Sequence, residues 1–175
     1  MRDQTRIQRY RRKVETAKFL PVSLVTVEFQ QNCNLGLVIR SAVCFGVKNV
    51  HVIGYCPPYA ELRACSGSTN HFVTITQHKT PSEFLSWRRK EDPNTDLISM
   101  ELTNEAESLV GFQPRKHSYI VVGNETSGVP VEILNQSDKV LYIPIPGIGF
   151  CLNTSFTSHI ALYELSRNNE QIPNN

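Results

Sequence analysis

The stretch that most constrains the fold is residues 140–165, because it joins an apolar strand, a stiff loop and a helix without interruption. The apolar run at 140–143 predicts a strand that must end at Pro144 and Pro146, since proline lacks the N–H that a sheet ladder requires. Beyond two glycines, Asn153 and the two residues after it are good helix caps. The apolar positions that follow recur at helical spacing: Phe156, Ile160, Ala161, Tyr163 and Leu165. Such a unit leaves backbone N–H groups for a small polar ligand, although it is also typical of an ordinary connection in an α/β domain.

The rest of the chain alternates short apolar strands with helical stretches. The pattern predicts strands at 24–29, 49–53, 72–76, 96–102 and 119–122, helices at 3–18, 34–45 and 81–89, and a short helix that starts at 131–134. In the second helix Asn34 is the expected cap, and the apolar stripe is Leu35, Val38, Ile39 and Ala42. The proline- and glycine-containing segment 55–71 is expected to be irregular. Because strands that alternate with helices form parallel sheets, the expected fold class is α/β, a parallel sheet flanked by helices. We expect a basic helical extension at 1–20, one domain at 21–167 and a polar tail at 168–175.

Charge is unevenly distributed along the chain. Residues 1–20 hold seven Lys or Arg and two acidic residues, a balance of +5, whereas the remaining 155 residues hold 11 basic and 14 acidic residues, a balance of −3. This asymmetry is typical of an arm that binds nucleic acid, with Arg9, Arg11 and Arg12 as candidate RNA-binding residues, but also of a solvated helix. Tyr10 is the only aromatic residue between the first and the last of these charges, Arg2 and Lys18, so we expect phosphate binding and little reading of bases.

Cysteine usage and hydropathy limit the setting. The five cysteines form an odd set without a C-x-x-C pair, which argues against both a disulfide framework and a zinc site. We therefore expect no metal. No run of about 18 apolar residues is present, so no membrane span is expected. With no apolar signal core either, a cytoplasmic protein is predicted.

Three loops are predicted at the carboxyl ends of strands, around residues 34, 123–128 and 144–153. Ligands bind at this edge of open α/β sheets. None of the loops has the G-x-G-x-x-G pattern, the G-x-x-x-x-G-K-[ST] pattern or the G-x-S-x-G nucleophile elbow. A nicotinamide site, a nucleoside triphosphate site and a serine hydrolase are therefore poorly supported.

These loops carry segments that resemble a known family. N-L-G-L-V-I-R (34–40), V-V-G-N-E-T-S-G-V (121–129) and I-P-I-P-G-I-G-F-C-L-N-T-S (143–155) resemble the three signatures of the SpoU–TrmH family of RNA ribose 2′-O-methyltransferases, in the SPOUT superfamily. The likeness extends from about residue 24 to residue 167. The basic first helix and A-C-S-G-S-T-N (64–70) look most similar to the branch that methylates a guanosine ribose in tRNA.

The resemblance implies a fold, a cofactor and an assembly. The parallel sheet would end in a deep trefoil knot whose loops bind S-adenosylmethionine, and two copies would form a homodimer with sites at the subunit interface. Methyl transfer would be to a ribose 2′-hydroxyl of RNA, with tRNA favoured and rRNA as the alternative. By position, the cofactor-binding residues would be Gly123, Ile143, Cys151 and Leu152, with Leu102 nearby. Ile143 and Leu152 are also suited to plain core packing.

Arg40 takes the place of the family's catalytic arginine, and Asn34, Glu125 and Asn153 match the polar residues around it. The ribose hydroxyl must lose its proton while it attacks the methyl group, but an arginine with a pKa above about 12 is a poor base. We therefore expect Arg40 to grip the adjacent phosphate and polarise the hydroxyl, with the phosphate or a water accepting the proton. Without the resemblance, Arg40 would be predicted to be an ordinary surface arginine. Glu125 could equally be a helix cap.

One departure from the family pattern bears on activity. Cys151 stands where most members have serine, and a thiol is a weaker hydrogen-bond partner than a hydroxyl. A catalytically weak or silent RNA-binding protein that keeps the fold is therefore the alternative to an active enzyme.

Overall fold

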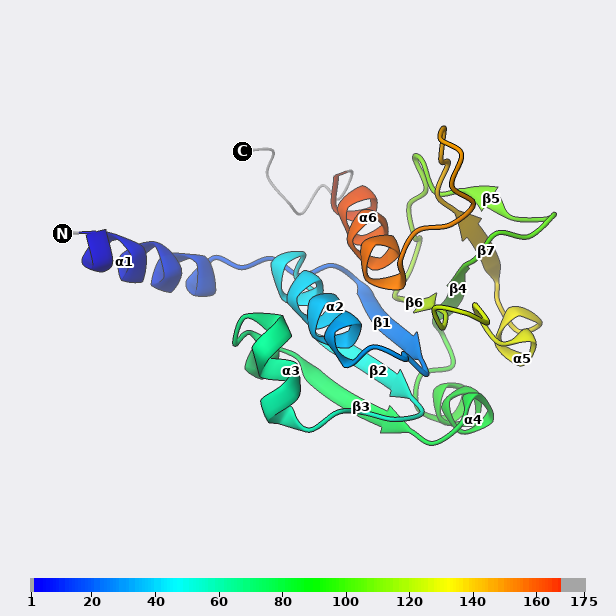
Figure 1. Ribbon diagram of the computed structural model, residues 1–175, viewed down its shortest axis with the longest axis horizontal. Helices are drawn as coiled ribbons and strands as arrows, with labels where there is room; N and C mark the ends of the chain where they lie inside the picture. The colour runs from blue at the N-terminus through cyan, green and yellow to red at the C-terminus, as the bar shows by residue number, and fades with distance from the viewer. Residues whose placement is uncertain (1, 168–175) are drawn as a thin grey trace.

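A seven-stranded sheet forms the middle layer of the molecule, in the order β3-β2-β1-β6-β4-β7-β5 (Figure 1). The computed structural model describes residues 2–167, so the polar tail expected at 168–175 lies outside the described residues. Every neighbouring pair of strands is parallel, which confirms the predicted α/β class. The strands are β1 (Val22–Val27), β2 (Asn49–Ile53), β3 (Thr74–His78), β4 (Asp96–Met100), β5 (Glu107–Ser108), β6 (Ser118–Val122) and β7 (Lys139–Tyr142).

Helices cover both faces of this sheet. They are α2 (Asn32–Cys44), α3 (Tyr59–Ser66), α4 (Pro81–Glu91), α5 (Val131–Leu134) and α6 (Thr154–Arg167), with a 3-10 turn η1 (Asn70–Phe72), whereas α1 (Arg2–Glu15) extends away from the sheet in Figure 1. Successive side chains of a strand point to opposite faces, so Leu24 packs with α2 and α6 while Val25 packs with α4 and α5. None of the helices within residues 2–167 has the length and apolar character needed to cross a membrane.

The predicted apolar stripe of α2 is confirmed, but the predicted cap is wrong. Leu35, Val38, Ile39 and Ala42 are all buried. Asn34 was expected to cap the helix, yet Gln31 holds the cap position and Asn34 lies in the first turn, where its side chain is turned toward another loop.

Segment 55–71 is not irregular as expected. It holds α3 and η1, and the prolines and glycine that indicated irregularity mark the ends of a helix instead. Pro58 occupies the cap position before α3, and Gly67 (φ 64°) ends the helix in the left-handed conformation.

One face of α6 differs from the prediction. Ala161 and Leu165 are buried as the spacing indicated. Phe156, Ile160 and Tyr163 are instead exposed, at 56%, 38% and 55% of their surface. The helix therefore carries a second apolar stripe that residues 2–167 leave exposed.

The cysteines also correct an expectation, because Cys33 and Cys65 form a disulfide. Their Cα atoms are 5.4 Å apart, within the range that a disulfide spans. The bond joins the first turn of α2 to the end of α3. Gly36 permits this close approach, since a Cβ at Gly36 would lie 2.5 Å from the Cβ of Cys65. The other cysteines are free: Cys44, Cys56 and Cys151.

Candidate functional site

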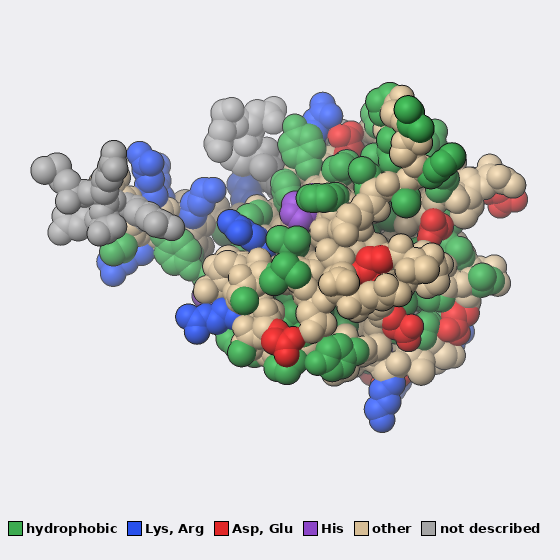
Figure 2. Space-filling view, viewed as in Figure 1, with side chains coloured by type: hydrophobic (Ala, Val, Ile, Leu, Met, Phe, Trp, Pro, Cys, Tyr) green, Lys and Arg blue, Asp and Glu red, His purple; other side chains and the backbone are tan. Residues whose placement is uncertain are grey.

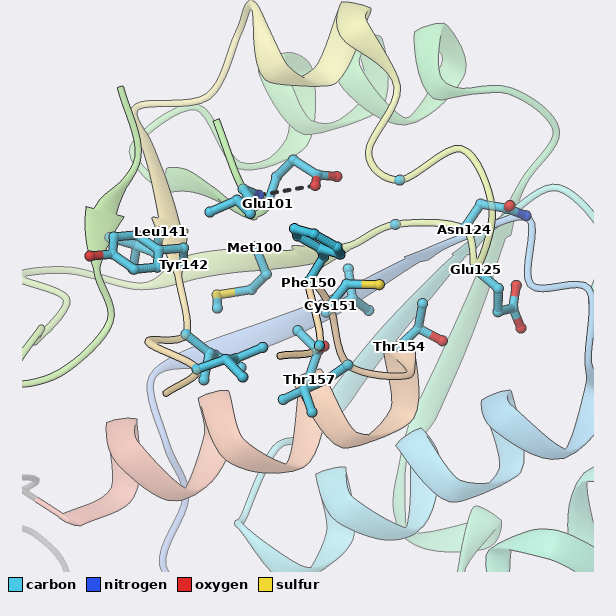
Figure 3. A pocket seen from close by; sticks show the side chains of 18 of the residues that line it. Met100, Glu101, Asn124, Glu125, Leu141, Tyr142, Phe150, Cys151, Thr154 and Thr157 are labelled. Carbon is cyan, nitrogen blue, oxygen red and sulfur yellow. Dashed lines mark hydrogen bonds between the residues drawn. The ribbon is translucent and has the colours of Figure 1, made fainter. Parts of the chain in front are cut away.

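A pocket of about 480 Å³ lies at the carboxyl ends of β4, β6 and β7 (Figure 3). These three strands are neighbours in the sheet, so the loops that follow them meet at one edge. The loop between β7 and α6 closes the pocket, and its Phe150 and Cys151 lie between Met100 of β4 and the first turn of α6 in Figure 3. A pocket of this size and position suits a small-molecule ligand.

All five predicted cofactor-binding residues line this pocket: Leu102, Gly123, Ile143, Cys151 and Leu152. They come from three loops and lie up to 50 positions apart in the chain, so the fold brings them together. Ile143 also packs against the larger core cluster, so this residue both lines the pocket and takes part in core packing.

Gly123 is a glycine because the backbone beside it leaves no room for a side chain. A Cβ at this position would overlap the backbone of Gly128 and Val129. The loop returns there in a tight turn: Asn124 N–H donates to Gly128 O (3.0 Å) and Gly128 N–H donates to Asn124 O (3.1 Å). The wall of the pocket at this point is therefore bare backbone.

Glu101 is a pocket residue that the sequence analysis missed. Its Oε2 accepts a hydrogen bond from Val129 N–H (2.8 Å) and its Oε1 accepts from Leu102 N–H (3.0 Å). The carboxylate thus ties the end of β4 to the loop after β6. Glu101 falls inside the strand predicted at 96–102, and a charged residue near the end of the otherwise uncharged run 97–102 was the one signal that could have identified it.

Glu125 joins the pocket to the start of α2. Its carboxylate accepts hydrogen bonds from Asn34 Nδ2 (2.6 Å), Gln30 N–H (2.8 Å) and Gln31 N–H (3.3 Å). Burial raises the pKa of this carboxyl, but the hydrogen bonds from Gln30, Asn34 and Gln31 together outweigh burial and hold the pKa below its usual value. The predicted pair of Asn34 and Glu125 is therefore in contact, with Glu125 ionised at neutral pH.

Asn153 and Arg40 lie outside the pocket lining within this one copy. Asn153 Oδ1 accepts from Ser155 N–H (2.9 Å) and Ser155 Oγ (2.6 Å), so it serves as the cap of α6. Arg40 is exposed on α2, and its guanidinium Nη1 would lie 3.4 Å from a Cβ built at Gly67. The structure thus brings Asn34 and Glu125 together and leaves Arg40 beside the end of α3.

One polar atom in the pocket has no partner in the described part of the chain. Thr154 Oγ1 is buried and makes no hydrogen bond there, although Thr154 lines the pocket at the first turn of α6. A buried hydroxyl without a partner costs free energy, so a ligand that satisfies it would be favoured.

Comparisons with known proteins agree with this geometry. The chain is 24% identical over 134 residues to the tRNA (guanosine(18)-2′-O)-methyltransferase of Escherichia coli K12, a match that covers 77% of this chain and 58% of that relative. It therefore spans less than two thirds of that relative's length. Its fold is similar to the crystal structure of the A. aeolicus TrmH/SpoU tRNA modifying enzyme, with TM-score 0.78, 22% identity and coverage of 91% of this chain and 82% of that one.

A further structure with a similar fold is a complex. The SpoU methyltransferase AviRb from Streptomyces viridochromogenes, solved with its cofactor AdoMet, has TM-score 0.74 and 20% identity, with coverage of 87% of this chain and 62% of that one. The family model described as "SpoU rRNA Methylase family" matches residues 21–163, from the start of β1 into α6. The chain belongs to the SpoU rRNA methylase family.

Proposed function

We propose that this protein transfers a methyl group from S-adenosylmethionine to a ribose 2′-hydroxyl of RNA, with tRNA as the favoured substrate and guanosine as the favoured nucleoside. The observation that carries the proposal is the convergence of all five predicted cofactor residues on one pocket at the carboxyl edge of the sheet. The relatives named as tRNA methyltransferases and the family membership support the reaction type.

The pocket is suited to S-adenosylmethionine in shape and chemistry. Apolar side chains including Leu141, Ile143 and Leu152 would contact the adenine, while backbone groups of the 143–152 loop and the free hydroxyl of Thr154 would meet its polar atoms. When bound, the cofactor supplies a methyl group on a positively charged sulfur, so it brings its own leaving group. The protein then has to align the ribose oxygen with that methyl group and to exclude water.

Arg40 would bind the phosphate beside the target ribose and polarise the 2′-hydroxyl, with the phosphate or a water as proton acceptor. Since Arg40 lies outside the pocket lining of its own copy, this role requires a homodimer in which the site forms between subunits. The exposed apolar stripe of α6, made of Phe156, Ile160 and Tyr163, supports such an interface, because stripes of this kind mark contact surfaces.

Two finer features of the proposal concern the chain path and the RNA. We propose that the segment after β7 threads through the chain as a trefoil knot. The packing of α6 back onto α2 and the fold shared with SpoU structures support this path, which an experimental backbone trace would test.

We also propose that Arg9, Arg11 and Arg12 of α1 bind RNA phosphates. The proposed location of the protein is the cytoplasm, where tRNA is found.

The alternative, a silent RNA-binding protein with the same fold, is favoured by one observation. Cys151 lines the pocket where most members have serine, so any hydroxyl contact to a ligand at this position would be replaced by a weaker thiol contact. A silent protein would still bind S-adenosylmethionine.

The test is methyl incorporation from labelled S-adenosylmethionine into bulk tRNA and into rRNA. We expect transfer by the wild-type protein, and a loss of about 100-fold or more in Arg40→Ala with cofactor affinity unchanged, because the arginine acts on the RNA. Arg89→Ala is the matched control, since Arg89 is exposed on α4, on the opposite face of the sheet. Cofactor binding without transfer to any RNA would establish the silent alternative, and an active Arg40→Ala would remove the arginine from the mechanism.

A further inference from the structure

Three exposed aromatic rings meet between α1 and η1. The ring centroids of Tyr10 and Phe72 are 6.0 Å apart, and those of His71 and Phe72 are 3.9 Å apart. Tyr10 is 53% exposed, Phe72 is 38% exposed, and His71 is exposed. The aromatic partners of Tyr10 lie more than 60 positions away in the chain, so its local sequence does not indicate them. We call Tyr10, His71 and Phe72 the α1–η1 surface.

The surroundings of the α1–η1 surface are basic. On α1, Arg9, Arg11, Arg12 and Lys13 are exposed, and Glu15 is the only acidic residue within 5–15. In Figure 2, Lys and Arg side chains on the face shown gather on α1 and the adjoining side of the body, while Asp and Glu lie mainly on the other side. Exposed aromatic rings among positive charges favour binding of nucleic acid, a polyanion whose bases have flat, apolar faces.

A short segment of chain connects this surface to the residue proposed to act on the ribose. Gly67, at the end of α3, lies against the guanidinium of Arg40, and η1 begins three residues later. Arg63 Nε donates to Ser68 Oγ (3.3 Å), and Asn70 Nδ2 donates to Tyr59 O (3.4 Å), so the segment between Arg40 and the rings is tied to α3. One strand of RNA could therefore contact Arg40 and the rings together.

We propose that the α1–η1 surface is a stacking platform for an unpaired base of the RNA substrate, flanked by α1 arginines that hold the neighbouring phosphates. The inference rests on the proposed function and names the form of RNA that it requires: single-stranded at this point. Bases stack on aromatic side chains only where they are not already stacked in a duplex, and such stacking tolerates any base. The platform would thus position the substrate without reading its sequence.

The test compares short single-stranded RNA with duplex RNA of the same length, using the double variant Tyr10→Leu with Phe72→Leu. Leucine keeps apolar volume but removes the rings. We expect affinity for single-stranded RNA to fall about tenfold, with affinity for duplex RNA, the salt dependence of binding and the affinity for S-adenosylmethionine unchanged. Quenching of a 2-aminopurine base in the single strand, a direct sign of stacking, would be lost in the variant. Tyr55→Leu is the matched control, since Tyr55 is exposed to a similar degree (62%) outside the cluster.

Three outcomes would overturn the platform. These are unchanged binding and quenching in the double variant, an equal loss with both forms of RNA, and an altered oligomeric state, which would make the surface a protein contact. If the wild-type protein methylates tRNA and the double variant binds single-stranded RNA normally, only the platform proposal is wrong. If the wild-type protein binds no RNA, the proposed function itself is wrong.

Discussion

The pocket and the α1–η1 surface are built in opposite ways. The pocket is made of loops whose backbones hold one another: Glu101 binds Val129 N–H, Glu125 binds the chain before α2, and Gly123 lets two backbone segments touch. The α1–η1 surface is made of side chains on a helix and a single turn, and Tyr10 and Phe72 are in ring contact there.

This difference indicates how far a substitution should spread. A change in the pocket disturbs backbone hydrogen bonds that also hold the sheet edge, so folding and cofactor binding should fail together. A change on α1 removes charge or ring without touching that framework, so RNA binding should change alone. Substitutions in the two regions, which differ in their expected effect on the free energy of unfolding, would test this separation.

The largest effect is expected for Gly123→Ala. The added methyl group would overlap the backbone of Gly128 and Val129, and relief would break the hydrogen bond from Val129 N–H to Glu101. We expect the free energy of unfolding to fall by roughly 3 kcal/mol or more, with loss of cofactor binding. Chemical denaturation and calorimetric titration measure both.

Gly147→Ala is the matched control for this change. Gly147 lines the same pocket, but nothing lies within 4 Å of a Cβ built there. Its stability should change by no more than about 0.5 kcal/mol. Equal effects of the two alanines would show that the close backbone approach at Gly123 does not support the fold.

The disulfide between Cys33 and Cys65 joins the two regions, because α2 contacts the pocket through Asn34 and α3 leads to η1. Closing a loop with a sequence separation of 32 limits the unfolded chain, so Cys33→Ser should lower the stability of oxidised protein by about 3 kcal/mol. Cys44→Ser, at a free and exposed cysteine, is the control and should have little effect. Dithiothreitol should lower the free energy of unfolding of the wild type and leave that of Cys33→Ser unchanged. An equal effect on both proteins would contradict the role of this bond.

A smaller effect is expected for Glu125→Gln, which keeps one acceptor oxygen and removes the charge. We expect a loss of about 1–3 kcal/mol at pH 7, since hydrogen bonds to a charged group are the stronger ones. The pKa of Glu125 is lowered in the folded protein, so its contribution is present above the ordinary value of 4.5 and is lost as the pH falls through the folded value.

The difference between wild type and Glu125→Gln should therefore be constant above pH 4.5 and should shrink below it. Denaturation curves from pH 7 down to pH 3 measure this. Glu132→Gln, on the exposed side of α5, is the matched control measured in the same way. A wild-type advantage that does not shrink at all between pH 4.5 and pH 3 would mean that the carboxylate charge is not the source of the effect.

Local patterns predicted the elements and the edge where the site lies. Hydrophobic period and the positions of proline and glycine act over a few residues, which is why β2 was predicted at its observed bounds and α5 at its observed start. The pocket edge followed from the same patterns, since carboxyl ends of parallel strands share one edge. The individual cofactor residues came from the resemblance and not from periodicity.

Contacts between distant residues could not be predicted in this way. Asn34 and Glu125 are 91 positions apart, Cys33 and Cys65 are 32 apart, and each pair forms only after the sheet is assembled. The two stripes of α6 show a second limit: Phe156 and Leu162 both follow a helical period, and only the packing decides which one is buried. Periodicity identifies a helix and leaves its orientation open.

The smallest effect on folding is expected for the joint replacement of Arg9, Arg11 and Arg12 by alanine. These side chains are exposed, and alanine is at least as good a helix former as arginine, so stability should change by less than about 0.5 kcal/mol. RNA affinity should still fall. The slope of log affinity against log salt should decrease in magnitude by about 2, because binding with fewer phosphate contacts releases fewer counterions. Binding of S-adenosylmethionine should stay as in the wild type. Parallel losses of RNA and cofactor binding would instead make α1 a structural part of the pocket domain, and the contrast between the two regions would no longer hold.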